Sequence, residues 1–252
     1  MAKKALDIVG PDYIPVTSSN FTKGPGRWLM LLEFWVVTYC IIISNYYFYS
    51  YAYQHNPWLF LLIPLTLWGT PYEFAFGTAV FSYILLKIFQ KIEPPKEGEF
   101  PIPSREYTYY CYRFTVCYYA IYFFRGLAIS WADMVAFEMF GMKVGKKVVL
   151  YDSWLDYEFV EVGDNVMLSM NAALISHCIY NKKMIVKRVS VGKNSIVGAE
   201  AVVAPGVTVE DGAILGVGGS TKIDQTLEGY STHVGNPAYK VLPIKIGEDS
   251  KK

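Results

Sequence analysis

Aliphatic residues recur every six positions between Val144 and Thr221. Most of these six-residue units begin with Val, Ile or Leu, the second residue is often Gly, and the fifth is usually small or aliphatic. The units start at Val144, Val162, Leu168, Leu174, Ile185, Val191, Val197, Val203, Val209 and Leu215. This period fits neither an amphipathic helix nor a β-sandwich, which alternates in twos. It predicts a parallel β-helix with three short sides and about 18 residues per coil.

Two irregularities interrupt the six-residue period. The units that would start at Leu150 and Asp156 fit badly, which indicates an irregular entrance coil. Between Leu174 and Ile185, one unit is followed by five extra residues, 180–184. Such an insertion leaves the coils intact and predicts a loop that projects from one corner, with His177 just before it.

The first half of the chain is apolar and aromatic, and it predicts a membrane α-helical part. Residues 1–27 form a basic arm, followed by transmembrane helices within 28–92, at about 28–53 and 58–91. We expect the second helix to break near Pro64–Pro71 and to span near 72–89. Residues 93–140 predict a linker and interfacial amphipathic helices, because arginines are spread among many tyrosines. The β-helix is expected over 141–228, with an exit arm and tail over 229–252.

Basic residues flank the two apolar stretches, and the loop between them has none. Lys3, Lys4, Lys23 and Arg27 precede the first stretch, and Lys87, Lys91 and Lys96 close the second. The positive-inside rule then predicts a multi-pass protein of the cell membrane with a cytoplasmic β-helix. The alternative is a third span within 105–140, which would place the β-helix outside. A net charge of +1 gives no argument for a nucleic-acid partner.

The six-residue units resemble those of the hexapeptide-repeat acyltransferases, and Val234–Ala238 is similar to that family's G-N-P-A exit signature. The resemblance covers about 140–241 and implies a left-handed β-helix. The order of membrane helices, Arg-bearing interfacial helix and β-helix is also similar to the C-terminal region of poly-lysine-synthetase-type peptide synthetases. In that family the unit is repeated in tandem, whereas this sequence holds one copy. The second resemblance supports the architecture more than the substrate.

Among the three histidines, His177 matches the position of the family's catalytic histidine. A histidine with a pKa near 6.5 is suited to taking the proton of an attacking amine or hydroxyl group. Its orienting partner remains open at this point: Glu158 and Glu161 lie about one coil before it, and Asp164 and Asn171 are nearby in sequence. The adjacent Cys178 is expected to fill the core.

The resemblance also implies a thioester donor, either coenzyme A or a carrier-bound thioester. It assigns the donor's arm to a groove lined by Gly198, Gly216, Gly235, Asn236 and Pro237. Lys193 and Lys222 are candidates for contacts to phosphates. No metal is expected: a γ-class carbonic anhydrase shares the fold, but its three-histidine pattern is missing here.

These observations predict a membrane-embedded acyltransferase that moves an acyl or aminoacyl group to an amino or hydroxyl acceptor, which is a small molecule or a peptide. The family packs three β-helices around an axis, so the resemblance implies a homotrimer with active sites at the subunit boundaries. The alternative is a non-catalytic β-helix trimer that acts as a membrane scaffold.

Overall fold

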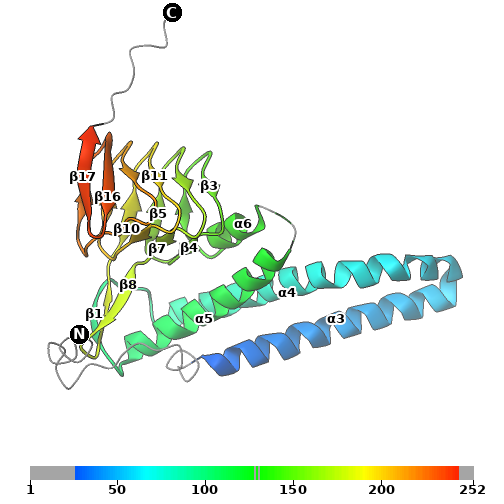
Figure 1. Cartoon of the computed structure of the whole chain (residues 1–252). Coiled ribbons are helices and arrows are strands. Elements are labelled where there is room, and N and C mark those ends of the chain that lie inside the picture. The colour runs from blue at the N-terminus through cyan, green and yellow to red at the C-terminus, as the bar shows by residue number, and fades with distance from the viewer. Residues whose placement is uncertain (1–25, 128, 130, 244–252) are drawn as a thin grey trace, which may run out of the picture. The chain divides into compact units, whose positions relative to one another are not determined.

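The structure is a computed structural model, and it describes residues 26–243 except 128 and 130. It divides into two units, one formed by the long helices and one formed by the strands (Figure 1). Most of the predicted N-terminal arm, and the tail after residue 243, lie outside the described residues. Each unit is described by itself below.

Short parallel strands build the coils of the β-helix in three sheets. The first sheet contains β2 (Lys143–Val144), β5 (Val160–Val162), β10 (Val189–Val191), β13 (Thr208–Val209) and β15 (Thr226–Leu227). The second contains β3 (Val149–Leu150), β6 (Met167–Leu168), β11 (Ile196–Val197), β14 (Ile214–Leu215), β16 (Ser231–Gly235) and β17 (Ala238–Pro243). The third contains β4 (Trp154–Leu155), β7 (Ala173–Leu174) and β12 (Val202–Val203). These stacked parallel sheets agree with the predicted β-helix.

The core of the β-helix follows the six-residue pattern. Leu168, Leu174 and Leu215 begin units and are fully buried, and Ala172 and Ala201 are fifth residues that are also fully buried. Burying these side chains removes apolar surface from water, which is the main favourable term in folding.

Close stacking of the coils explains the glycine at the second position of a unit. A Cβ atom on Gly145 would lie 2.4 Å from the carbonyl carbon of Gly163 in the next coil. A side chain at that corner would push the coils apart, so glycine is required there by space.

The insertion is longer than predicted. Lys146 and Asp164 hold the same corner in successive coils and are 18 residues apart. Asn165 and Asn194 do so across the insertion and are 29 residues apart. The predicted insertion of five residues is therefore wrong, since the residues from Ile185 onward do not start a side of a coil. They belong to β9 (Lys183–Val186), which forms an antiparallel hairpin with β8 (His177–Tyr180).

Two predicted boundaries of the β-helix also differ from the structure. Part of the expected linker is β1 (Gly98–Pro101), which pairs antiparallel with β9. At the other end, the expected exit arm begins with β16, which still pairs in parallel with β14, and the chain then returns as the antiparallel strand β17. The six-residue period does not reveal β1 or β17, because neither strand begins a six-residue unit.

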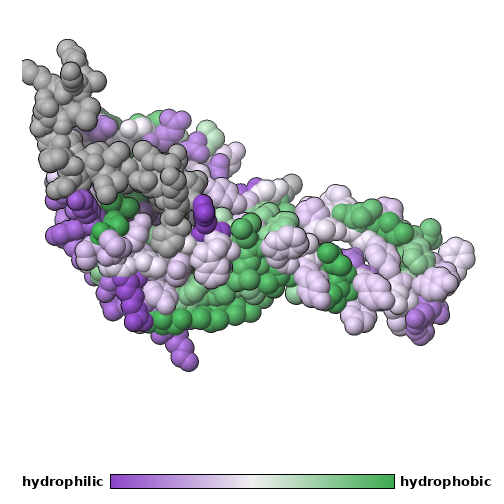
Figure 2. All heavy atoms as spheres, turned by 90° about the horizontal axis from the view of Figure 1, so that it is seen from below, coloured by the Kyte–Doolittle hydropathy of each residue, from purple (hydrophilic) through white to green (hydrophobic). Residues whose placement is uncertain are grey.

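The helical unit contains α3 (Arg27–His55), the 3₁₀ helix η1 (Pro57–Leu62), α4 (Ile63–Ile92), α5 (Arg105–Gly126) and α6 (Ala132–Met139). Two segments, Arg27–His55 and Pro57–Ile92, are long and apolar enough to span a membrane. Hydrophobic side chains gather over the helices in the space-filling view (Figure 2). The predicted break near Pro64–Pro71 is wrong: α4 is continuous through Pro71. Pro64 sits in its first turn, where no backbone N–H is needed.

Helix α5 differs from the predicted interfacial helix. It packs against α3 and α4, and Arg113 is buried and donates a hydrogen bond to the carbonyl oxygen of Glu93 at 3.0 Å. This arginine of the predicted interfacial segment is therefore turned toward the protein interior. A second buried polar contact joins the helices: Ser82 of α4 donates to the carboxylate of Glu33 in α3 at 3.0 Å.

Candidate active site

The hairpin of β8 and β9 projects where the chain passes from the third sheet to the first. We call this position, through all coils, the hairpin corner. Asn181 and Lys182 form a two-residue turn with positive φ angles of 47° and 58°. Two left-handed residues match the twist of the flanking strands and close a tight hairpin. The hairpin is widened by β1, so that β9 lies between β1 and β8.

His177 lies at the base of this hairpin and contacts Asp156 from the coil before. Leu155 pairs with Leu174, which brings the residues that follow them together. The Nδ1 atom of His177 lies 2.6 Å from Oδ2 of Asp156. The same oxygen accepts hydrogen bonds from the backbone N–H groups of Ser176 at 2.6 Å and His177 at 3.2 Å. These contacts fix both the ring and the hairpin base on one carboxylate.

This pair determines the protonation of the ring. Because the carboxylate accepts a hydrogen bond from Nδ1, Nε2 is the nitrogen that takes up a proton. Burial lowers the pKa of His177, but the charge of Asp156 and its hydrogen bond raise it, and the net pKa lies above the ordinary value. The ring is buried except for 17% of its side-chain surface. A carboxylate-bound histidine of this kind is suited to general base catalysis.

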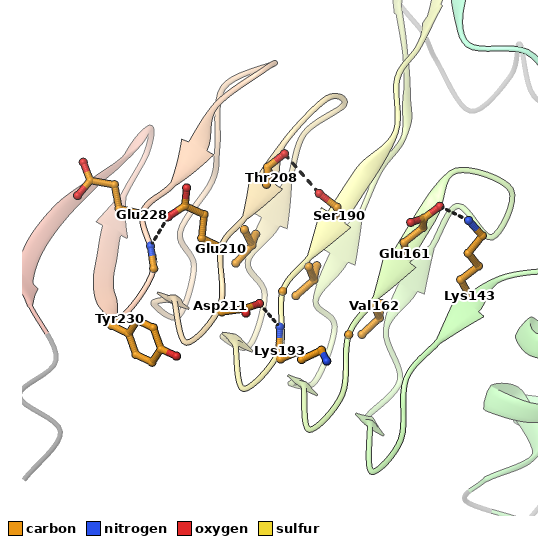
Figure 3. A pocket seen from close by; sticks show the side chains of 15 residues that line it. Lys143, Glu161, Val162, Ser190, Lys193, Thr208, Glu210, Asp211, Glu228 and Tyr230 are labelled. Carbon is orange, nitrogen blue, oxygen red and sulfur yellow. Dashed lines mark hydrogen bonds and ion pairs between the residues drawn. The ribbon is translucent and has the colours of Figure 1, made fainter.

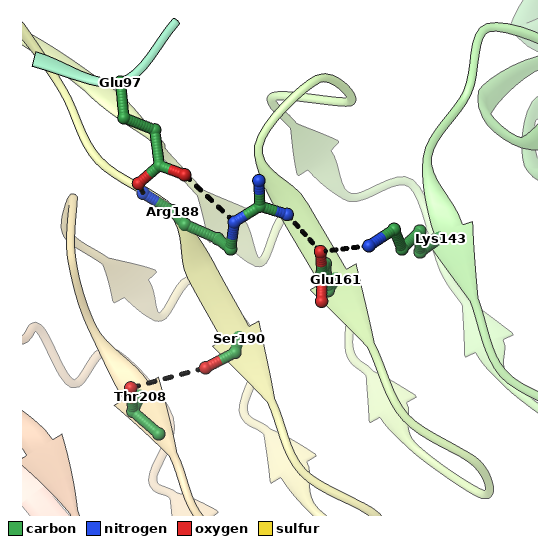
Figure 4. A network of polar contacts seen from close by, with 6 residues as sticks. All are labelled: Glu97, Lys143, Glu161, Arg188, Ser190 and Thr208. Carbon is green, nitrogen blue, oxygen red and sulfur yellow. Dashed lines mark hydrogen bonds and ion pairs between the residues drawn. The ribbon is translucent and has the colours of Figure 1, made fainter.

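Asp156, rather than Glu158 or Glu161, is the residue at Nδ1, so the predicted partner is corrected. Glu161 instead pairs with Lys143 at 2.7 Å and with Arg188 (Figure 4). The hydrogen bond from Lys143 and the charges of both cations hold the pKa of Glu161 below its usual range. Glu158 is half-buried in the turn after Asp156.

The irregular entrance coil explains why spacing missed Asp156. Val149 pairs with Met167, but Trp154 pairs with Ala173, so the entrance coil is one residue shorter between β3 and β4. Asp156 is consequently 21 residues before His177, farther than the regular coil length suggests. The badly fitting unit at Asp156 was the available signal.

An ion-pair network joins the hairpin to β1 and to the first sheet. Arg188 donates from Nε to Oε1 of Glu97 at 3.0 Å and from its backbone N–H to Oε2 at 3.1 Å, and it also contacts Glu161 (Figure 4). Lys183 of β9 pairs with Glu99 of β1 at 3.2 Å. The network holds β1 against the hairpin that carries His177.

The residues predicted to line the thioester lie at a different corner. Gly198, Gly216 and Gly235 follow strands of the second sheet, where the chain turns toward the third. We call this the glycine corner. The backbone N–H groups of Gly198 and Gly216 donate within the β-helix, to Leu215 and His233, at 2.8 Å each.

These two N–H groups are therefore engaged within the β-helix, and the assignment of this corner to the thioester arm stays a prediction. Asn236 accepts a hydrogen bond from Ser220 through its side chain, and Pro237 follows it in the turn between β16 and β17. The glycine corner and the hairpin corner lie at opposite edges of the third sheet. One chain by itself does not bring its predicted thioester residues to its own His177.

The other predicted residues are distributed as follows. Lys222 lies at the hairpin corner, where Lys187 also forms an ion pair with Asp224. Lys193 lies between the first and second sheets, and its side chain is 3.4 Å from the carboxylate of Asp164.

Cys178 is half-buried in β8 rather than in the core, which corrects that prediction. Among the described residues, no group of three or more His, Cys, Asp and Glu side chains is placed to hold a metal ion.

A groove of about 860 Å³ runs over the first sheet (Figure 3). Its lining residues form hydrogen bonds between successive coils: the Ser190 hydroxyl donates to Thr208 at 3.3 Å, and the backbone N–H of Lys193 donates to the carboxylate of Asp211 at 2.7 Å. The lining extends toward Tyr230 and does not include His177. This groove therefore lies over the first sheet and its corner toward the second sheet, away from the hairpin corner.

Several proteins of known structure resemble part of the chain. No protein-family model and no curated protein matches the chain. A maltose O-acetyltransferase from Clostridium difficile 630 is similar in structure at 20% identity and a TM-score of 0.45, over 51% of this chain and 84% of that one. A galactoside acetyltransferase in complex with coenzyme A is similar at 16% identity and a TM-score of 0.43, over 58% and 86%. An N-acyltransferase from Bacillus cereus in complex with dTDP and 3-hydroxybutyryl-CoA is similar at 20% identity and a TM-score of 0.32, over 40% and 65%.

These neighbours are hexapeptide-type acetyltransferases and an acyltransferase, as the resemblance in sequence predicted. Each TM-score is below 0.5, so these similarities carry neither a fold nor an activity over to this chain. The resemblance to peptide synthetases stays a prediction.

Proposed function

We propose that the chain is a membrane-embedded acyltransferase with a left-handed β-helix and a thioester donor. The observation that carries this proposal is the contact between His177 and Asp156 at the base of the hairpin. It supplies a fixed, partly exposed imidazole with a defined proton-accepting nitrogen. The acceptor is an amino or hydroxyl compound, and the donor is coenzyme A or a carrier thioester carrying an acyl or aminoacyl group.

In the proposed reaction, Nε2 of His177 takes the proton of the acceptor as its nitrogen or oxygen attacks the thioester carbonyl. The new C–N or C–O bond forms while the C–S bond breaks. The departing thiolate receives a proton from the imidazolium, which returns His177 to its neutral form. Asp156 stabilises the transient positive charge on the ring and keeps its hydrogen bond with Nδ1 throughout.

We also propose a homotrimer in which a neighbouring copy completes the site. The separation of the hairpin corner from the glycine corner supports this arrangement, because only a second copy can bring the exit turn at Asn236 and Pro237 close to His177. A ring of three closes such a heterologous contact without growing a filament. The mass of the purified protein in detergent tests this directly, and an active species of one chain would contradict it.

The membrane part of the proposal rests on α3 and α4, with both ends of this helical pair in the cytoplasm. A single cysteine placed at Asn56, between the two helices, should react with an impermeant reagent added outside the cell. If a cysteine at Asn56 and a cysteine in the β-helix were equally protected from this reagent, the proposed membrane topology would be contradicted.

The decisive assay is the release of free thiol from acetyl-coenzyme A by the purified protein, with and without a panel of amines and alcohols. We expect release that depends on an acceptor and a product that carries the acyl group. The absence of transfer with every donor and acceptor, from a protein that is trimeric and folded, would favour the scaffold function instead.

A further inference from the structure

The strongest feature outside the candidate site is Glu73 in α4. Its side chain is exposed, and among the described residues none forms a hydrogen bond or an ion pair with its carboxylate. It lines a groove of about 590 Å³ between α3 and α4. The rest of the lining is apolar or small, as in Val36, Ile41, Val80 and Ile84. A carboxylate among apolar side chains is stabilised by pairing with a group of opposite charge.

Glu73 lies at the middle of the helical pair. The two helices are antiparallel: Tyr49 contacts Thr66 near one end, and Ser82 contacts Glu33 near the other. Ile41, which shares the groove with Glu73, is the central residue of Arg27–His55. If α3 and α4 cross the membrane as proposed, Glu73 therefore lies near the bilayer centre. Charged side chains at that depth are rare and pair with an opposite charge or face a protein interior.

Within α3 and α4 no cation lies at this depth, and Arg125 of α5, which follows the residues that contact Phe74 and Phe76, has contacts of its own. The lysine and arginine residues of α3 and α4 are Arg27, Lys87 and Lys91. Lys87 is the nearest to Glu73 along α4, about 21 Å away at 1.5 Å per residue. The α3–α4 face of a second copy would bring the same carboxylate, not a cation.

The surface around Glu73 also admits another helix. Gly69 lies one turn before it on α4, and Gly77, one turn after it, lies against Val37 of α3. A Cβ atom on Gly69 would meet nothing within 4 Å, so this position leaves open space. A small residue in such an open position lets the backbone of a neighbouring membrane helix approach closely.

We propose that the groove between α3 and α4 binds a transmembrane helix of another protein, one that carries a lysine or arginine at the bilayer centre. The basic side chain pairs with Glu73, and apolar residues of the partner helix fill the groove on either side. This inference rests on the proposed spanning of α3 and α4, and it is independent of acyl transfer. It gives the helical part a specific partner in addition to anchorage.

The exposed Cys40 provides a native reporter, since it lines the same groove. The full chain is reconstituted in vesicles with a synthetic Leu/Ala transmembrane peptide that has one central lysine and one cysteine beside it. We expect a disulfide between the peptide and Cys40, absent in Cys40→Ser. Glu73→Gln should weaken the association roughly 3- to 20-fold, the range of interhelical polar contacts in membranes.

Matched variants separate charge from packing. Glu73→Lys combined with a peptide that carries a central glutamate should restore the cross-link. Val80→Phe should abolish it by filling the groove, while Leu67→Phe, on an exposed position outside the groove, should not. Acyl transfer measured in the same vesicles should be unchanged in Glu73→Gln, which separates this test from that of the proposed function.

Three results would overturn the proposal. One is a cross-link whose yield is the same when the peptide lysine is replaced by leucine. Another is displacement of the peptide by a long-chain alkylamine that itself binds in a Glu73-dependent way, which would make the occupant an amphiphile. The third is a Cys40–Cys40 cross-link between two copies that excludes the peptide.

Discussion

The β-helix buries its large apolar side chains, whereas α3 and α4 expose most of theirs. In the β-helix the leucines that begin units point inward, and Leu174 is fully buried. In α3 and α4 the large apolar residues point outward, with Trp35 exposed to 67% and Leu67 to 68%. Water favours the first arrangement and a hydrocarbon surrounding favours the second. The difference supports the proposal that the helices cross a membrane while the β-helix does not.

The polar residues of the two units differ in a related way. In the β-helix, buried Asp156 accepts hydrogen bonds from the backbone N–H of Ser176 and from the imidazole of His177. In the helical pair, the exposed Glu73 faces apolar neighbours. A polar group with its partners in place is suited to catalysis, and one that lacks them in an apolar setting is suited to recognition.

The largest effect should come from His177. We expect His177→Asn to lower acyl transfer by roughly 10²–10⁴-fold, because the general base is lost while the fold is kept. His55→Asn is the matched control, since His55 lies at the exposed end of α3, and it should retain full activity. Initial rates of thiol release measure both. Equal rates in the two variants would remove the catalytic role of His177.

The contrast in burial predicts the next largest effect, on stability. Leu174→Ala should lower the free energy of unfolding of the β-helix by about 2–5 kcal/mol, because it leaves a cavity in a closely packed core. Leu67→Ala, on the exposed surface of α4, should leave it within about 0.5 kcal/mol. Denaturant titration followed by the β-sheet circular dichroism signal compares the two. A similar loss in both would mean that the units do not differ as described.

The smallest effect should come from the ion pairs that hold β1 to the hairpin. Glu97→Gln removes the carboxylate from Arg188 on an exposed surface, where such pairs contribute about 0–1 kcal/mol. We expect the acyl-transfer rate to fall by less than about fivefold, with no change in its dependence on pH. A loss comparable to that of His177→Asn would mean that β1 positions the histidine.

The sequence alone predicts the β-helix well because its period dictates which residues stack. Val162, Leu168 and Leu174 each start a side of one coil, and the structure pairs each of them with its counterpart in the next. Prediction fails where the period stops. The hairpin after Leu174, the strand β1 and the strand β17 have no six-residue signature, since antiparallel pairing depends on contacts between distant segments.

The candidate site shows the same division. Family resemblance and the place before the insertion single out His177 as a candidate, but nothing in the spacing singles out Asp156, because the entrance coil is one residue short between β3 and β4. The residues predicted for the thioester come from family resemblance, and hydrogen bonds within the coil already use the amides of Gly198 and Gly216. Proline positions likewise mislead for α4, because Pro71 is accommodated inside a continuous helix.

The pH dependence of acyl transfer by the wild type and by Asp156→Asn tests the central claim most directly. His177 must be neutral to act as a base, so kcat/KM should fall as the pH drops through the pKa of this residue. Because Asp156 raises that pKa, the acid limb of the wild type should lie above the pH of an ordinary histidine, and Asp156→Asn should move it to lower pH. The variant should also lose roughly 10- to 100-fold in rate at its plateau, the value of a hydrogen bond to a charged group. An acid limb at the same pH in both proteins would contradict the claim that this pair carries the reaction.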